Sequence, residues 1–480
     1  MYEKFGQFIN GKWQQSADKG TYEVINPATE EVIGKASKAS SIEVQKALKS
    51  AEKGLEIWKN TAPWQRAYIL RKIADLMREK KDVLAKWLTL EVGKPLNEAL
   101  GEVGGSADIF EWNAEETKRI YGQTVESRFP DTRVHVYYQP VGVVAALVPW
   151  NFPITLASRK ISTSLAAGCS VICKPDVITP GAVMELVNIC KEAGVPDGVV
   201  NLLSGDPAEI SNELMESDII KKVSVTGSTR VGKIILKKAA DKVQRVTMEL
   251  SGHSPFIVCE DVDMNKVADI AITGKFRNNG QVCISPNRFY IQENRKDDFV
   301  NAFIERAKKL KIGNGMDEGV DLGPMTTAKR LEEIEKLVET TKKEGAEVLM
   351  GGQRPPGFNK GYYYEPTVFD NVKDNFTIMK EEPFGPLVPI LTFKTFDEVI
   401  ERANDNDLGL CSYLYTNSMD KAHIGSEKLE TGCVAVNTGV VAIAEAPFGG
   451  IKQTGYGREG GSGAIKDYLN VKYTHMGLKI

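Results

Sequence analysis

One cysteine of the chain lies in a loop suited to nucleophilic chemistry. The stretch FRNNGQVCISPNR at 276–288 presents Cys283 after a helical segment and before a strand-like run. The glycine in this loop lets the backbone approach a reacting carbon closely. Cys283 is therefore the candidate nucleophile. The other six cysteines are interpreted as small buried hydrophobic residues; they are Cys169, Cys173, Cys190, Cys259, Cys411 and Cys433.

Two polar residues follow apolar runs typical of buried strands. Asn151 lies in PWNFP at 149–153, where prolines fix a turn and the amide could stabilise a developing oxyanion. Glu249 closes the run RVTMEL, and in a dry cleft its carboxylate would be a general base with a raised pKa. A rigid turn and a surface carboxylate are the alternatives. His253, a little further on, is interpreted as structural.

A glycine-containing motif, VTGSTRVG at 225–232, suggests a phosphate site. A strand is followed by Gly227, Ser228 and Gly232 at an expected helix N-terminus, where exposed amides and the helix dipole suit a pyrophosphate. The motif is not the dinucleotide fingerprint G-x-G-x-x-G, and a simple glycine turn is the alternative.

The elements that must position these residues alternate along the chain. Short apolar runs, separated by helix-length segments, occur at 143–148, 170–173, 199–203, 221–225 and 245–250. This spacing predicts βαβ units and a parallel sheet covered on both faces, with ligands at the carboxyl ends of its strands. A second α/β unit is expected from 256–259 through a helix near 264–276 to a strand at 288–292.

Three further segments have clear periodicity. The apolar residues of 65–90 recur at helical spacing, which predicts one long amphipathic helix. Alternating segments at 133–138 and 471–476 predict strands that would be marginal alone. They are expected to pair with each other or with a neighbouring subunit.

The bulk properties exclude several function classes. The chain has 480 residues and a formal net charge of -3, with no long run of like charges, so a nucleic-acid partner is not expected. No signal peptide and no stretch of ~20 apolar residues occurs, which favours a cytoplasmic protein without membrane contact. Seven cysteines and four histidines lack the spacing of a disulfide framework or a zinc site, so no metal is expected.

Together these motifs resemble the aldehyde dehydrogenase superfamily, particularly its succinate-semialdehyde and alpha-ketoglutaric semialdehyde dehydrogenases. The likeness includes FINGKW at 8–13, EEPFGP at 381–386 and PFGGIKQTGYGREG at 447–460. The resemblance implies an α/β fold of three parts: a Rossmann-like cofactor domain at 1–122 and 141–253, a catalytic domain at 254–458, and a small β oligomerisation element at 123–140 and 459–480. It also implies a homodimer or homotetramer.

The resemblance implies a reaction sequence centred on the cysteine. Cys283 attacks the aldehyde, and the Asn151 side chain with the Cys283 backbone N–H holds the oxyanion of the thiohemiacetal. After hydride transfer to the nicotinamide, water activated by Glu249 hydrolyses the thioester to the free acid. Lys160 is a candidate proton relay.

The resemblance also identifies residues for the cofactor, NAD or NADP. The matching positions are Trp150, Lys174, Gly227, Ser228, Glu382 and Phe384. The family often has a glutamate three residues after the lysine, where its carboxylate accepts hydrogen bonds from the ribose. Here the residue is Val177, which removes a repulsion against a 2′-phosphate and favours acceptance of NADP.

Two arginines bear on the aldehyde substrate. Arg159 and Arg277 match positions that bind the substrate carboxylate in succinate-semialdehyde dehydrogenases, and a guanidinium can pair bidentately with a carboxylate. The expected substrate is therefore succinate semialdehyde or alpha-ketoglutarate semialdehyde. The alternatives are lactaldehyde or another small aldehyde, pairing of the arginines with structural carboxylates, and a non-catalytic family member.

Overall fold

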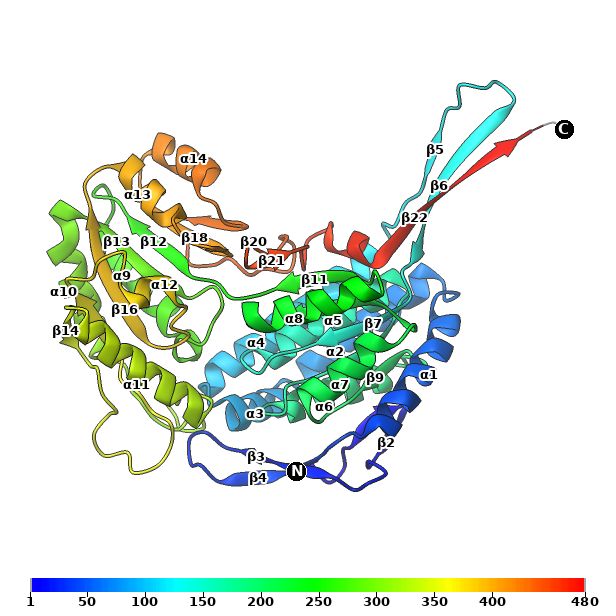
Figure 1. Ribbon diagram of the computed structural model, residues 1–480, viewed down its shortest axis with the longest axis horizontal. Coiled ribbons are helices and arrows are strands. Elements are labelled where there is room, and N and C mark those ends of the chain that lie inside the picture. Colours follow the sequence, from blue (N-terminus) through cyan, green and yellow to red (C-terminus); the bar gives the residue numbers. More distant parts are fainter. Residues whose placement is uncertain (1, 479–480) are drawn as a thin grey trace.

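The computed structural model describes residues 2–478 of the chain. Two large β-sheets with flanking helices form the two halves of the body, and a ribbon of three strands projects from one of them (Figure 1). No helix within 2–478 is long and apolar enough to cross a membrane.

The first sheet has eight strands in the order β2-β1-β9-β8-β7-β10-β11-β21. Its strands are β1 (Gln7–Ile9), β2 (Lys12–Gln14), β7 (Val143–Leu147), β8 (Ser170–Lys174), β9 (Val200–Leu202), β10 (Ile220–Thr226), β11 (Arg245–Glu249) and β21 (Gly455–Tyr456). The five central strands, which are β9, β8, β7, β10 and β11 in spatial order, run parallel. All five runs predicted as parallel strands are confirmed. From β7 the chain adds β8 and β9 on one side and then β10 and β11 on the other, so the strand order reverses between β7 and β10.

Helices cover both faces of this sheet. They are α1 (Ser41–Trp58), α2 (Pro63–Glu79), α3 (Lys81–Val92), α4 (Leu96–Thr117), α5 (Pro153–Ala167), α6 (Pro180–Glu192), α7 (Pro207–Glu216) and α8 (Thr229–Asp241). Along β7, Val143 and Ala145 belong to the core under α1, α7 and α8, whereas Val144 and Ala146 belong to the core that contains α5 and α6. This alternation is why the buried strands are apolar at every position.

The prediction of one long helix over 65–90 is wrong. Helix α2 ends at Glu79, Lys80 has φ -96° and ψ 18°, and α3 begins at Lys81. The break leaves Val83 49% exposed although it fits the helical apolar pattern. Periodicity alone did not reveal the break because the residues around Lys80 include neither glycine nor proline.

The second sheet has seven strands in the order β14-β15-β16-β13-β12-β18-β19. They are β12 (Ser254–Val258), β13 (Pro286–Gln292), β14 (Glu347–Met350), β15 (Thr367–Asp370), β16 (Leu387–Phe393), β18 (Cys411–Tyr415) and β19 (Cys433–Val436). All neighbours are parallel except β14, which is antiparallel to β15. The predicted second α/β unit is confirmed.

The helices of the second half are α9 (Met264–Phe276), α10 (Lys296–Ala307), α11 (Ala328–Lys343), α12 (Thr377–Lys380), α13 (Phe396–Asn404) and α14 (Met419–Lys428). Three short 3-10 helices are η1 (Arg277–Gly280), η2 (Glu293–Arg295) and η3 (Ala464–Tyr468). Two further strand pairs are β3 (Thr21–Ile25) with β4 (Val32–Ser37), and β17 (Leu408–Gly409) with β20 (Ile451–Lys452).

The projecting ribbon joins segments that are far apart in the sequence. It contains β5 (Gln123–Val125), β6 (Thr132–Pro140) and β22 (Leu469–Gly477), with β22 antiparallel to β6 (Figure 1). The two alternating segments therefore pair with each other, as one of the two expected arrangements required. The oligomerisation role of this ribbon and the residue boundaries of the three domains stay predictions.

Candidate active site

The carboxyl ends of four central strands of the first sheet carry predicted site residues. Asn151 follows β7, Lys174 ends β8, Gly227 follows β10 and Glu249 ends β11. Neighbouring parallel strands end at the same edge of a sheet, so these residues from separate motifs gather along one edge. This is the edge where open α/β sheets bind their ligands.

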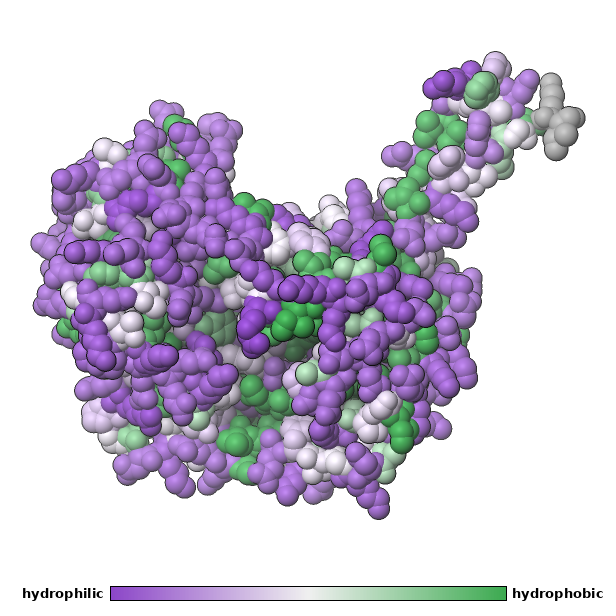
Figure 2. Space-filling model, viewed as in Figure 1, coloured by the Kyte–Doolittle hydropathy of each residue, from purple (hydrophilic) through white to green (hydrophobic). Residues whose placement is uncertain are grey.

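The second sheet contributes loops that enter the amino ends of its strands. Cys283 precedes β13, Gly252 precedes β12, and Glu382 and Phe384 precede β16. The candidate active site thus lies between the carboxyl edge of the first sheet and the amino edge of the second. Figure 2 shows a recess between the two halves of the body, with hydrophobic residues gathered in and around it.

The loop before Cys283 has an unusual backbone. Asn278, Asn279 and Gly280 have φ values of 47°, 53° and 75°, a run of left-handed conformations that costs free energy. A Cβ at Gly280 would lie 2.2 Å from the carbonyl oxygen of Gly385, so this loop packs directly on the EEPFGP loop. The side chain of Gln281 fixes the turn, since its Nε2 donates to the Asn278 carbonyl at 3.0 Å.

Asn151 lies against this loop. Its side chain is buried, and Nδ2 donates to the carbonyl oxygen of Gln281 at 3.1 Å, two residues before Cys283. An amide nitrogen has two N–H groups, so a second donor remains for a ligand. The structure thus brings together two motifs that are 130 residues apart. The oxyanion-binding role stays a prediction.

The surroundings of Cys283 favour the protonated thiol. Burial, and then the carboxylates of Glu382 and Glu249, raise its pKa to about 12. The loop after Glu249 packs on the cysteine, because a Cβ at Gly252 would lie 2.3 Å from the Cys283 carbonyl oxygen. Formation of the thiolate therefore needs a base or a favourable charge that reaches the thiol.

Glu249 is a buried carboxyl group without a partner. It is 2% exposed, and within residues 2–478 neither of its oxygens has a hydrogen-bond donor. Burial, and next the charge of Glu459, raise its pKa well above the usual value. A Cβ at Gly449 would lie 2.5 Å from Glu249 Oε1, so only glycine fits beside the carboxyl group. A raised pKa and free oxygens are what a general base for water requires.

Behind Glu249 lies an ion pair that sequence reasoning identified only in part. The Lys160 Nζ donates to Glu459 Oε1 at 2.5 Å and to Thr226 Oγ1 at 2.7 Å. Glu459 is buried, and its Oε2 has no partner among the described residues. It lies in the PFGGIKQTGYGREG stretch used for the family resemblance, but only the fold reveals a partner 299 residues away.

Three residues predicted to bind cofactor lie near one another. The rings of Trp150 and Phe384 meet edge to face, with centroids 5.5 Å apart. Glu382 Oε1 accepts a hydrogen bond from the Gly252 backbone N–H at 3.2 Å, and burial raises the pKa of this carboxyl group to about 7. The Nε2 of His253 lies 3.1 Å from the carbonyl oxygen of Ile378 in helix α12, which agrees with a structural role.

The other predicted cofactor residues differ in their surroundings. Ser228 caps α8 by accepting a hydrogen bond from the Val231 N–H at 3.3 Å, and a Cβ at Gly227 would meet nothing within 4 Å. Lys174 is buried, and burial lowers the pKa of its amine. A hollow of about 550 Å³ includes Val177 in its lining, three residues after this lysine.

The two predicted substrate arginines differ in their surroundings. Arg159, on α5, is 3% exposed, lies 4.8 Å over the Phe448 ring, and its Nη1 has no partner within 2–478. Arg277, at the end of α9, is exposed and lies 4.6 Å over the Phe152 ring. Of these two arginines, only Arg159 is therefore a buried cation with an unused donor.

The remaining cysteines agree with their predicted burial, with one exception. Cys169, Cys173, Cys190, Cys259 and Cys411 are buried, and all seven cysteines are free thiols. Cys433 is only partly buried, so its prediction is wrong. Its Sγ lies 4.0 Å from the carbonyl oxygen of Gly449, the residue next to the Glu249 carboxyl group, because Cys433 begins β19 and the amino ends of the second sheet face the site.

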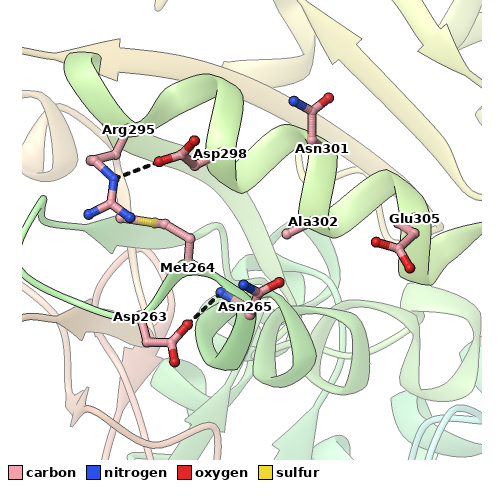
Figure 3. Close-up of a pocket in the computed structure, with 8 residues that line it drawn as sticks. All are labelled: Asp263, Met264, Asn265, Arg295, Asp298, Asn301, Ala302 and Glu305. Atoms are coloured by element: carbon pink, nitrogen blue, oxygen red, sulfur yellow. Dashed lines mark hydrogen bonds and ion pairs between the residues drawn. The ribbon is translucent and has the colours of Figure 1, made fainter.

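Another hollow, of about 560 Å³, lies between α9 and α10, away from these residues (Figure 3). Several of its charged groups have structural partners: Arg295 pairs with Asp298 at 2.9 Å, and Asp263 caps α9 through the Asn265 N–H. Among the described residues, no cluster of three or more His, Cys, Asp or Glu could hold a metal ion.

Comparison with known proteins identifies close relatives along almost the whole chain. The chain is 42% identical to glutarate-semialdehyde dehydrogenase of Pseudomonas putida, with 97% of this chain and 96% of that protein covered. It is 40% identical to an NADP-dependent succinate-semialdehyde dehydrogenase of Escherichia coli, with 98% and 97% covered. It is also 40% identical to 3-sulfolactaldehyde dehydrogenase of Pseudomonas putida, with 98% and 96% covered.

Solved structures match the fold equally well. Succinate-semialdehyde dehydrogenase of Burkholderia pseudomallei has a TM-score of 0.97 and 39% identity, with 98% of each chain covered. Betaine aldehyde dehydrogenase of Staphylococcus aureus, solved in complex with NAD+, has a TM-score of 0.96 and 35% identity, with 99% of this chain and 95% of that chain covered. The predicted fold is confirmed.

The family model with the description "Aldehyde dehydrogenase family" matches residues 13–474, which include every predicted site residue. The family predicted from the separate motifs is therefore confirmed: this chain belongs to the aldehyde dehydrogenase family.

Proposed function

We propose that the protein oxidises an aldehyde with a distal anionic group, such as succinate, glutarate or alpha-ketoglutarate semialdehyde, to the free acid with NAD or NADP. The observation that carries the proposal is Arg159, a buried guanidinium whose Nη1 has no partner within the described chain. Burial of a cation whose N–H group lacks a hydrogen-bond acceptor costs free energy. A ligand that supplies an anion would reduce this cost.

The relatives support an anionic substrate. The names of these relatives refer to glutarate semialdehyde, succinate semialdehyde and 3-sulfolactaldehyde. Each of these compounds carries a negatively charged group remote from its aldehyde. An uncharged substrate such as lactaldehyde would leave Arg159 unpaired. The exposed Arg277, held over Phe152, is proposed to guide the same anion from outside.

The proposed reaction starts at the thiol. Cys283 loses its proton and its sulfur bonds to the aldehyde carbon, while Asn151 Nδ2 and the Cys283 N–H hold the oxygen that becomes negative. The carbon–hydrogen bond then breaks, and the hydride leaves with both bonding electrons to the acceptor that a bound NAD or NADP would supply. The oxygen returns to a carbonyl, and the resulting thioester remains on Cys283. Glu249 takes a proton from water and the hydroxide adds to the thioester carbon. The carbon–sulfur bond then breaks, which releases the acid and leaves the Cys283 sulfur as a thiolate.

The pairing of Lys160 with Glu459 supports a proton route away from Glu249. The charge of the Glu459 carboxylate contributes to the raised pKa of Glu249. When Glu249 accepts a proton, the repulsion between the two carboxylates is therefore lost. Lys160 holds Glu459 at 2.5 Å, so the two act as one buried pair beside the base. We propose that this pair relays the proton. A non-catalytic family member would have no use for such a relay.

The residues present fit a nicotinamide cofactor. Trp150, the open space beside Gly227 and the buried Lys174 lie along the ligand-binding edge of the first sheet, and the Phe384 ring meets Trp150 edge to face from the second sheet. When bound, NAD or NADP supplies the acceptor for the hydride. Lys174 and Glu382 are proposed to hold its ribose hydroxyls, and the apolar Val177 leaves room beside the adenosine ribose for a 2′-phosphate.

The ribbon of β5, β6 and β22 is proposed to join subunits into a homodimer or homotetramer. It exposes large apolar side chains on a thin three-stranded sheet; these are Val125, Val471, Tyr473 and Met476. Such residues on a sheet that is marginal alone favour burial against another copy.

A substrate panel with arginine variants tests the proposed function. Arg159→Ala should lower kcat/KM for succinate and glutarate semialdehyde by about ten- to hundred-fold, the value of a charge-assisted hydrogen bond, while butanal loses little. Arg277→Ala should have a smaller effect of the same kind. Arg306→Ala, which removes a surface arginine paired with Asp269, serves as the control. Equal losses for anionic and uncharged aldehydes would refute the anionic substrate.

A further inference from the structure

A second buried ion pair lies beneath Asn151, at the junction of α3 and α4. The Lys94 Nζ and Glu102 Oε2 are 2.5 Å apart, and their side chains are 0% and 1% exposed. Removing two charges from water costs free energy that a pair recovers only with good geometry and further hydrogen bonds. The additional partners of this pair therefore show what it does.

Those partners belong to the PWNFP turn. The Lys94 Nζ donates to the main-chain oxygen of Asn151 at 2.9 Å and lies 3.7 Å from the centre of the Phe152 ring. The Oε1 of Glu102 accepts hydrogen bonds from the N–H groups of Ile154 and Thr155, at 3.2 and 3.3 Å, in the first turn of α5. The pair thus holds Asn151 and the helix that follows it together.

The same Asn151 carbonyl is tied to the cysteine loop. It accepts a second hydrogen bond from Asn278 Nδ2 at 3.1 Å, and the Asn151 side chain donates to the Gln281 oxygen at 3.1 Å. Asn151 is therefore fixed at its main chain and at its side chain relative to the loop of Cys283. A shift of the Asn151 main-chain carbonyl would turn the side-chain amide away from the oxygen of a thiohemiacetal formed on Cys283.

The position of Lys94 is itself set by the second half of the molecule. A Cβ at Gly315 would lie 2.4 Å from the Lys94 carbonyl oxygen, and one at Gly323 would lie 1.9 Å from the Gly93 oxygen. The loop that contains both glycines precedes α11 and packs directly on the Lys94 backbone. Lys94 thus receives its position from one half and transmits it to Asn151 in the other.

We propose that Lys94 and Glu102 are positioning residues for the oxyanion donor Asn151, which they hold in register with Cys283. The proposal rests on the oxyanion role given to Asn151 in the proposed function. The charge of Lys94 acts through the Asn151 main chain and does not touch the substrate. Loss of the Lys94 charge should therefore lower kcat, while cofactor binding and the reactivity of the Cys283 thiol stay unchanged.

The first experiment removes both charges together. Lys94→Met/Glu102→Gln leaves no unpaired buried charge, and the glutamine oxygen can still accept from α5. We expect kcat to fall by about ten- to hundred-fold, the scale for a small misplacement of a catalytic group. The KM for NADP and the rate of alkylation of Cys283 by iodoacetamide should stay within about twofold of the parent enzyme. Lys296→Met/Asp370→Asn, which removes a remote pair 2.6 Å apart, is the matched control and should leave kcat unchanged.

The second experiment is a double-mutant cycle. Asn151→Ala should lower kcat by about 10²–10³ in the parent enzyme. In the Lys94→Met/Glu102→Gln background it should cost less than about fivefold, because the donor is already misplaced. If this doubly substituted protein does not fold, Lys94→Arg, which keeps the charge but changes the reach of the donor, takes its place in the cycle.

The outcomes separate the two hypotheses. An equally large loss from Asn151→Ala in both backgrounds would overturn the positioning role and leave the oxyanion role intact. A parent enzyme indifferent to Asn151→Ala would refute the oxyanion role instead. A parallel fall in kcat, NADP affinity and alkylation rate would show a general structural role for Lys94, which also overturns the inference.

Discussion

The two sheet edges that meet at the site hold their functional groups by different means. On the first edge, Asn151, Lys174 and Glu249 stand at or just beyond the ends of regular parallel strands. On the second edge, Cys283 follows three residues with positive φ, and Phe384 itself has φ 47°. The difference indicates a rigid edge that places binding and acid–base groups, and a strained edge that presents the reacting thiol.

The second edge is tested most directly at its thiol. Cys283→Ala should abolish dehydrogenase and esterase turnover together, because both would pass through the same sulfur. Steady-state assays with an aldehyde and with p-nitrophenyl acetate measure the two activities. The matched control is Cys433→Ala, which removes the other partly buried thiol near Glu249 and should retain turnover. Persistent esterase activity in Cys283→Ala would place the nucleophile elsewhere.

The first edge is tested at its base. Glu249→Gln should lower steady-state turnover by about 10²–10⁴, the contribution of a general base, but leave the first hydride transfer. Stopped-flow absorbance should then show a burst of one reduced cofactor per active site. Absence of both burst and acyl-enzyme would mean that Glu249 acts before hydride transfer, at the thiol of the other edge.

The raised pKa of Cys283 predicts a pH dependence. Because burial and neighbouring carboxylates raise this pKa to about 12, the thiolate fraction is small at neutral pH and increases as the pH rises. Below the pKa it grows about tenfold per pH unit, so alkylation by iodoacetamide without cofactor should accelerate roughly hundredfold from pH 7 to pH 9. A rate that levels off below pH 8 would show a thiol activated in the resting enzyme.

The strain of the second edge is tested by a glycine. Gly280→Ala introduces a Cβ at φ 75°, 2.2 Å from the Gly385 oxygen, so the cysteine and EEPFGP loops must separate. We expect a loss of stability of about 1–3 kcal/mol and roughly tenfold lower kcat. Thermal unfolding and kinetics measure both. Gly104→Ala, in α4 with nothing within 4 Å, is the control and should be neutral or stabilising.

The smallest expected effect concerns cofactor choice on the rigid edge. Val177→Glu should place a carboxylate beside the adenosine ribose and shift the ratio of kcat/KM for NAD to that for NADP by about tenfold toward NAD. Val177→Gln, of similar size and no charge, should shift it less. An identical ratio in the parent enzyme and both variants would mean that residue 177 does not sense the 2′-phosphate.

The sequence predicted the strand ends well because each motif is local. A buried apolar run followed by Asn151 or Glu249 identifies both the strand and the residue at its end. Lys94, Glu102 and Glu459 were missed, since their importance depends on partners brought close only by the fold. The break at Lys80 was missed for a related reason, as no local residue type enforces it.

The contact between Lys160 and Glu459 spans 299 residues and affects how the enzyme can be made. Synthesis completes the five central strands of the first sheet at Glu249, long before Glu459 or the edge strand β21 emerges from the ribosome. Until then a nascent chain would hold Lys160 without its counter-ion and Glu249 beside an uncovered sheet edge. Regain of activity on refolding should therefore follow docking of the segment around Glu459, and chains that stop before it should yield no partly active enzyme.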